Sequence, residues 1–267
     1  MQLSQISTMA VAAAEEEASG HGQSLSSDVV MRLGPFDISN HILSAWFVML
    51  VLVIVAFLAT RNMKLVPSGL QNLAEVIVEA LIGLIQQVAG SRGRAFAPIV
   101  MTAFLFILSA NWLGTLPIFE NIHVVDEAHH SEMALLKSPN SSLNVTASMA
   151  IIVFLLSQVF AIKTNGVLGY LKEFAIPNPL HILTELSRPL SLSLRLFGNI
   201  FAGGVLVHTM LGIAAPITFV FLGLELFVGV VQALIFTMLT LVFLTIAVTP
   251  HAGHDDAHGD AHAAAHH

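Results

Sequence analysis

The chain has 267 residues, of which 55% are hydrophobic and only 10% are charged. Because an ordinary soluble domain is about 25% charged, this composition indicates a polytopic membrane protein in contact with a lipid bilayer. The ten lysines and arginines are scattered without a basic patch, so nothing in the charge pattern points to nucleic acid. The absence of cysteine excludes a disulfide framework and a cysteine-based metal site.

Composition divides the chain into three regions. Residues 1–40 form an N-terminal segment, residues 41–249 a membrane domain, and residues 250–267 a tail rich in histidine. The spacing of the histidines invites a metal-binding interpretation, but the tail's bias toward a few small and polar residues favours a disordered, solvated end. We therefore expect no metal site and no cofactor.

Five stretches of the membrane domain are apolar and long enough to cross a bilayer, which takes about 20 helical residues. The last two are longer than a perpendicular crossing requires, so we expect them to be tilted and to form a hairpin. In chain order, the five stretches are Ile42–Ala59, Phe96–Leu116, Val145–Ile162, Pro179–Ile213 and Pro216–Val248.

The segment Pro67–Gly90 differs from these five stretches. Leucine and isoleucine recur in it at helical spacing, and glutamine and glutamate interrupt them. This pattern predicts an amphipathic helix on the membrane surface. The expected fold is therefore an all-α polytopic membrane protein with about five crossing helices and one interfacial helix.

Positive charge predicts the orientation of the chain in the membrane. Basic residues flank the interfacial segment, and Lys163 and Lys172 lie between the third and fourth crossings, so both segments should be cytoplasmic. The acidic loop from Ile118 to Asn144 should face the outside together with the N-terminus. Five crossings then place the C-terminus in the cytoplasm.

Two ionisable residues stand out in the last two apolar stretches. Arg195 is the last lysine or arginine of the chain, and Glu225 is the only carboxylate between it and Pro250. An arginine at the bilayer centre costs about 2.5–3.5 kcal/mol, so such residues are usually functional. One interpretation is a structural salt bridge between Arg195 and Glu225. The other is a mechanistic role, since a guanidinium that cannot lose its proton attracts a partner's carboxylate and blocks proton leakage.

Helical spacing places further polar side chains on the same faces as this pair. Ser191 and Asn199 lie one turn on either side of Arg195, and Gln232 lies two turns after Glu225. Considered alone, the amides of Asn199 and Gln232 are equally well explained as hydrogen bonds between helices. Glu185 and Arg188, three residues apart, are compatible with a simple surface pair.

The block ELSRPLSLSLRLFGNIFAGG at residues 185–204 closely resembles the signature of F-type ATP synthase subunit a of the bacterial type. In this resemblance the family's essential arginine falls on Arg195 and its polar asparagine on Asn199. The run from Gln232 to Phe236 is similar to the family's final helix, and Glu225 occupies the polar proton-path position before it. One position departs from some members, which have Glu or His where this chain has Gly204.

Shorter motifs extend the resemblance over about residues 35–248. They are the segment from Asn111 to Pro117 at the end of the second crossing, Pro67–Gln71 at the start of the amphipathic helix, and Pro139–Asn144 before the third crossing.

The resemblance implies a proton-translocating stator subunit of a rotary ATP synthase in a bacterial inner membrane. Expected partners are a ring of rotor c subunits, the peripheral-stalk b subunits and the remaining subunits of the synthase. Arg195 would separate two offset half-channels, and Asn199, Glu225 and Gln232 would line the proton path. The candidates for further half-channel lining are Glu185, Ser187, Ser191, His208, Asn111 and His123. The chain has no Gly-x-x-x-x-Gly-Lys-Ser/Thr phosphate loop, so catalysis must reside on other subunits.

Three other classes of protein fit less well. A stand-alone ion channel or secondary transporter predicts internal repeats, and none is evident between the two halves of the sequence. An intramembrane protease needs a Ser–His or paired-Asp arrangement within the crossings, which they lack. A purely structural anchor does not explain the charged pair Arg195 and Glu225.

Overall fold

The structure is a computed structural model that describes residues 29–33, 36–115, 123–126, 131–134, 137–175, 179–213 and 215–249. The histidine-rich tail and most of the N-terminal segment lie outside these residues. The described part is almost entirely helical, in agreement with the all-α prediction. Its long helices are α2 (Asn40–Thr60), α3 (Leu70–Ala89), α4 (Gly93–Thr115), α6 (Leu143–Ala175), α7 (Pro179–Ile213) and α8 (Ala215–Ala247).

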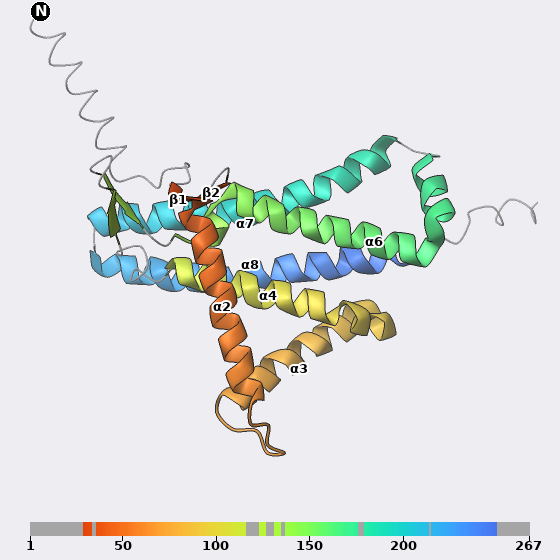
Figure 1. The fold of residues 1–267 in the computed structure, drawn as a ribbon, viewed down its shortest axis with the longest axis horizontal. Coiled ribbons are helices and arrows are strands. Elements are labelled where there is room, and N and C mark those ends of the chain that lie inside the picture. Colours follow the sequence, from red (N-terminus) through yellow and green to blue (C-terminus); the bar gives the residue numbers. More distant parts are fainter. Residues whose placement is uncertain are drawn as a thin grey trace, which may run out of the picture.

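Helices α4, α7 and α8, and α6 up to its kink, run along the long axis of the molecule, as Figure 1 shows. In that layer α4 packs most extensively on α8, α6 packs on α7, and α7 packs on α8. Helix α2 crosses the layer steeply, and α3 leaves the end of α2 obliquely to reach the start of α4 (Figure 1). Both ends of α3 are set by glycines with positive φ, Gly69 at 62° and Gly90 at 57°, a conformation that favours glycine.

Six helices of the described chain are long and apolar enough to cross a membrane. Five of them correspond to the predicted crossings to within a few residues at their shared ends, and the sixth is α3, the segment predicted to lie at the interface. Polar side chains project from α3, which fits a surface position, but length and composition alone also allow a crossing. The division into five crossings and one interfacial helix therefore stays a prediction.

Helices α7 and α8 are 35 and 33 residues long. At a rise of 1.5 Å per residue, each extends over about 50 Å, well beyond a hydrocarbon core of about 30 Å. They are separated in sequence by one residue and pack on each other, which agrees with the expected hairpin.

Helix α6 differs from the prediction because it continues well past Ile162. Gly166, with φ 71° and ψ 160°, interrupts its helical backbone and produces a kink. The short elements of the fold were not predicted. They are the 3₁₀ turns η1 (Gly90–Arg92) and η2 (Pro139–Ser141) and two antiparallel hairpins, β1 (Val29–Leu33) with β2 (Phe36–Ser39) and β3 (His123–Asp126) with β4 (Ser131–Ala134).

Helix α8 joins the two apolar clusters of the core. Ala233 and Phe236 belong to a cluster with side chains of α3, α4, α6 and α7, while Leu241 and Leu244 pack with α3 and α4. The outward faces of α7 and α8 carry large apolar side chains, among them Leu190 and Phe227, that are more than half exposed. In a membrane protein, such faces meet lipid or other apolar subunits.

Candidate functional site

Arg195 lies on α7 beside the stripe of that helix that packs against the rest of this chain. Leu192, Leu196 and Ile200 are spaced one turn apart and are almost completely buried, with exposed fractions of 3%, 0% and 5%. This stripe attaches α7 to the other helices, so Arg195, one residue before the fully buried Leu196, is exposed. Ser191 is exposed one turn earlier, on the same side of the helix.

Within the part of the chain that the structure describes, Arg195 makes no hydrogen bond or ion pair. The structural salt bridge between Arg195 and Glu225, considered above as an alternative, is therefore absent from this arrangement. A guanidinium remains charged at every working pH, and a charge in a membrane is costly without a partner. The geometry thus leaves Arg195 available to a group outside this chain.

Glu225 faces α7 near Gly203, which is eight residues after Arg195 on that helix. Together with Asn199 it lines a cavity of about 200 Å³ between α7 and α8. A Cβ at Gly203 would lie 3.1 Å from Oε1 of Glu225, which is tighter than most Cβ contacts. The missing side chain at Gly203 therefore lets the glutamate sit close against the α7 backbone, as small residues do at membrane helix contacts.

Gln232 lies two turns after Glu225 on α8 and is only 4% exposed. Its Nε2 atom is buried and has no hydrogen-bond partner among the described residues. An unsatisfied buried polar group costs about 1–3 kcal/mol, so this amide is unusual for a side chain with a purely structural task. Asn111 and Asn140 nearby each make side-chain hydrogen bonds, although the buried Oδ1 of Asn140 also has no partner among the described residues.

Asn111 of α4 is one such amide, because it joins α4 to α8. Its Nδ2 donates to the carbonyl oxygen of Gly229 at 3.0 Å, and its Oδ1 accepts from Nδ2 of Asn140 at 2.7 Å. A Cβ at Gly229 would approach the Cβ of Asn111 to 3.2 Å, so the two helices touch there. Gly229 lies one turn after Glu225, and Asn111 is therefore beside the face of α8 that carries Glu225 and Gln232.

Sequence reasoning missed a second layer of polar residues around Asn111. His41 of α2 contacts the carbonyl oxygen of Ser138 through Nδ1 at 3.0 Å, and Ser138 donates through Oγ to the carbonyl oxygen of Ala110 at 3.2 Å. Asn140 is completely buried next to them. The motif Pro139–Asn144 was the available signal, but only the folded chain places it on α4, where a side chain at Gly114 would clash with Ser138.

The remaining candidates are not brought into this cluster by described contacts. Ser187 is exposed on α7, one turn before Ser191. Glu185 and His208 belong to α7 and His123 to β3, and the side chains of these three lie outside what the structure describes. Among the residues searched for metal sites, no group of three His, Cys, Asp or Glu side chains lies close enough to hold an ion.

Comparison with known proteins fixes the family. The model of the family "ATP synthase A chain" matches residues 42–245. The chain belongs to the ATP synthase subunit a family. Among its relatives, subunit a of Moorella thermoacetica is 33% identical over 229 residues, covering 83% of this chain and 96% of that protein. Subunit a 2 of a Bradyrhizobium strain is 36% identical over 231 residues, covering 84% and 95%. Subunit a of Gloeobacter violaceus is 34% identical over 231 residues, covering 84% and 89%.

Membership of the subunit a family confirms the resemblance on which the sequence prediction rested. The chain is a multi-pass, non-catalytic component of the membrane sector of a bacterial ATP synthase, and its role belongs to ion transport for ATP synthesis. This assignment is preferred to a stand-alone channel, a transporter and an intramembrane protease.

Proposed function

We propose that this chain supplies two offset proton half-channels to the carboxylates of a ring of rotor c subunits, and that Arg195 separates them. The observation that carries this proposal is the position of Arg195. It is a cation within the apolar span of α7, it is exposed beside the packing stripe of that helix, and it pairs with no described residue.

A carboxylate on a neighbouring subunit is the partner that fits Arg195 best. The attraction between opposite charges is strong at low dielectric, so the guanidinium draws a deprotonated rotor carboxylate to itself and holds it between the two pathways. Because Arg195 cannot release its own proton, it does not relay protons from one pathway to the other. A proton must therefore travel on the rotor carboxylate, and its movement is coupled to rotation.

Polar side chains of α7 and α8 form the entry pathway in this proposal. Asn199 and Glu225 share a cavity, and the buried Nε2 of Gln232 offers a donor without a described partner. Asn111 holds α8 in place beside these groups through Gly229. Ser187, Ser191 and Glu185 remain candidates for the exit pathway, and His208 and His123 remain candidates for the outer mouth.

The proposal also includes the placement of the chain in the complex. The exposed apolar faces of α7 and α8 around Arg195 support contact with the rotor ring, and the peripheral-stalk b subunits would hold the chain as part of the stator. The bacterial relatives and the distribution of positive charge support the inner membrane, with the N-terminus outside and the C-terminus in the cytoplasm.

The test is ATP-driven proton pumping by inverted membrane vesicles that carry the complex with Arg195→Ala. We expect pumping to be lost while the complex still assembles, because Arg195 contributes nothing to the described packing of this chain. Arg61→Ala is the matched control, since Arg61 is an exposed arginine at the end of α2, outside the proposed path. Normal pumping by the Arg195 variant would refute the gate.

A further inference from the structure

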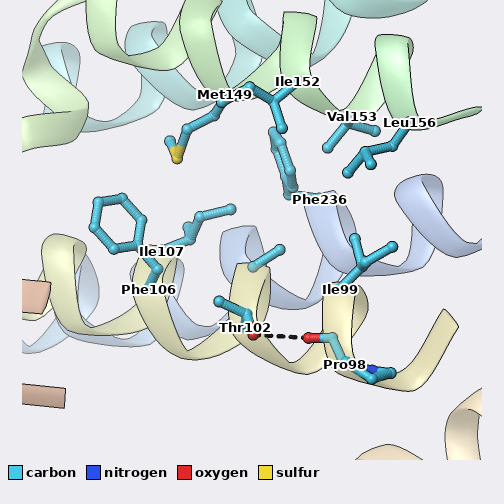
Figure 2. A pocket seen from close by; sticks show the side chains of 11 residues that line it. Pro98, Ile99, Thr102, Phe106, Ile107, Met149, Ile152, Val153, Leu156 and Phe236 are labelled. Atoms are coloured by element: carbon cyan, nitrogen blue, oxygen red, sulfur yellow. Dashed lines mark hydrogen bonds between the residues drawn. The ribbon is translucent and has the colours of Figure 1, made fainter. Parts of the chain in front are cut away.

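An apolar groove of about 440 Å³ lies between α4 and α6. Figure 2 shows Met149, Ile152 and Leu156 of α6 facing the side chains of α4, with Phe236 of α8 between the two rows. The one hydroxyl in the lining, that of Thr102, donates to the carbonyl oxygen of Pro98 at 2.7 Å. The described lining therefore offers an occupant no unsatisfied side-chain hydrogen-bond group, and it suits a hydrocarbon.

The length of the groove accommodates part of a hydrocarbon chain. The α4 part of the lining, from Pro98 to Ile107, extends over about 13.5 Å at 1.5 Å per residue.

Both helices that form the groove carry an exposed cation at the same end of it. The helices run antiparallel, and the rings of Phe96 and Phe160, with centroids 5.2 Å apart, join them at this end. Arg94 precedes Pro98 by one turn. Lys163 follows Leu156 by seven residues, two turns along the same face of α6.

We propose that this groove is a binding site for an anionic glycerophospholipid. One acyl chain lies between α4 and α6 against Phe236, and the phosphate lies at the end of the groove where Arg94 and Lys163 are exposed. Long basic side chains extend toward the headgroup region while their stems cover apolar surface, and each one near an anionic lipid contributes to binding. The proposal rests on the groove and its two cations and is independent of the proton pathway.

The experiment measures the lipid that the assembled ATP synthase retains. The complex is reconstituted in vesicles of equal parts phosphatidylglycerol and phosphatidylcholine, purified again in detergent, and its bound lipids are quantified by mass spectrometry. We expect phosphatidylglycerol to be enriched over phosphatidylcholine. The double variant R94Q/K163Q should lower that enrichment about thirtyfold, as expected for the loss of two cations near an anionic headgroup.

A second variant tests the apolar part of the site. Ala103→Phe places a ring in the groove, because Ala103 is one of its lining residues, and it should lower retention of phosphatidylglycerol as strongly as R94Q/K163Q does. Arg61→Gln and Ala80→Phe are the controls, since both residues are exposed elsewhere on the chain. They should leave retention unchanged. Equal retention of the two lipids by the unaltered complex, or the same enrichment in every variant, would overturn the proposal.

Photolabelling gives an answer that does not depend on how well the variants fold. Phosphatidylglycerol with a photoreactive acyl chain should attach to peptides from α4 and α6 of the unaltered complex, and R94Q/K163Q should reduce the yield. If a helix of another subunit fills the groove instead, a photoreactive residue at Ile152 will capture protein and the lipid label will be absent. That result would also overturn the proposal. A failure of the Arg195 gate would change neither readout.

Discussion

Two polar regions of this chain lie within its apolar helices and are built in opposite ways. At the junction of α4 and α8, Asn111 and Asn140 are buried and hydrogen-bonded to each other, and Asn111 also donates to Gly229. On α7, Arg195 is exposed and makes no described hydrogen bond or ion pair. The amides of the first region bond to each other and to the backbone, with only Oδ1 of Asn140 left without a described partner, whereas Arg195 has no described partner at all.

This difference separates groups that stabilise the fold from groups that serve a partner. A buried polar group that is satisfied internally contributes to stability, and removing one side of the pair leaves the other unsatisfied. A charge left exposed to the membrane face adds nothing to the fold and remains only if something outside the chain needs it. Glu225 and Gln232 lie between these extremes, because they are near the junction but belong to the proposed pathway.

The sharpest test of this contrast is Glu225→Gln. Glutamine keeps the shape that packs against Gly203 but removes the charge and the ability to exchange a proton. We expect ATP-driven pumping to fall by about 100-fold, within the range that a positioned acid–base group contributes, while the amount of assembled complex stays the same. Pumping is measured in inverted vesicles and normalised to assembled complex.

Glu79→Gln is the matched control for this change, because Glu79 is an exposed carboxylate of α3. It should pump like the unaltered complex. Unchanged pumping by the Glu225 variant would remove this carboxylate from the pathway and assign it to the packing of α7 on α8.

Asn111→Leu should have the opposite effect, because it should lower assembly and stability but not pumping. It leaves Nδ2 of Asn140 without its 2.7 Å acceptor and removes the contact with Gly229, and such losses cost about 1–3 kcal/mol for each buried group. We expect less assembled complex and a lower midpoint of thermal denaturation in detergent. Pumping by each complex that does assemble should be largely retained.

Ser148→Ala serves as the control, because the Ser148 hydroxyl makes only an exposed bond within α6, to the carbonyl oxygen of Asn144. Its effect on the denaturation midpoint should be small. If Asn111→Leu instead leaves assembly intact and stops pumping, Asn111 belongs to the proton path and the contrast drawn above is wrong for it.

Sequence alone identified the exposed charge better than the buried junction. Arg195 is conspicuous because a cation in a long apolar stretch has a high cost that must be explained, and no folding detail is needed to notice it. The membrane helices were also predicted, because a long apolar stretch is visible in the sequence without any detail of the fold. Helix α2 was predicted as Ile42–Ala59 and is Asn40–Thr60, and α8 was predicted as Pro216–Val248 and is Ala215–Ala247.

The junction could not be read from the sequence, because its bond partners are far apart in the chain. Asn111 and Gly229 are separated by 118 positions, and His41 and Ser138 by 97. A local pattern carries no information about which amide will meet which carbonyl oxygen. The kink at Gly166 was not predicted either, because glycine permits a positive φ but does not require one.

The smallest effect is expected at the end of α8, where Arg92 makes another internally completed contact. Its Nη1 donates to the carbonyl oxygen of Val248 at 3.1 Å, and a cation at a helix C-terminus also interacts favourably with the helix dipole. Arg92→Gln should therefore destabilise the chain by about 1 kcal/mol and lower the denaturation midpoint by about 2–4 °C, with normal pumping. Arg61→Gln, which removes an exposed arginine without such a contact, should not shift the midpoint. Loss of pumping without a change in stability would show that an arginine bonded within the chain also serves transport. Hydrogen bonding within the chain would then no longer distinguish polar residues that stabilise the fold from those that serve a partner.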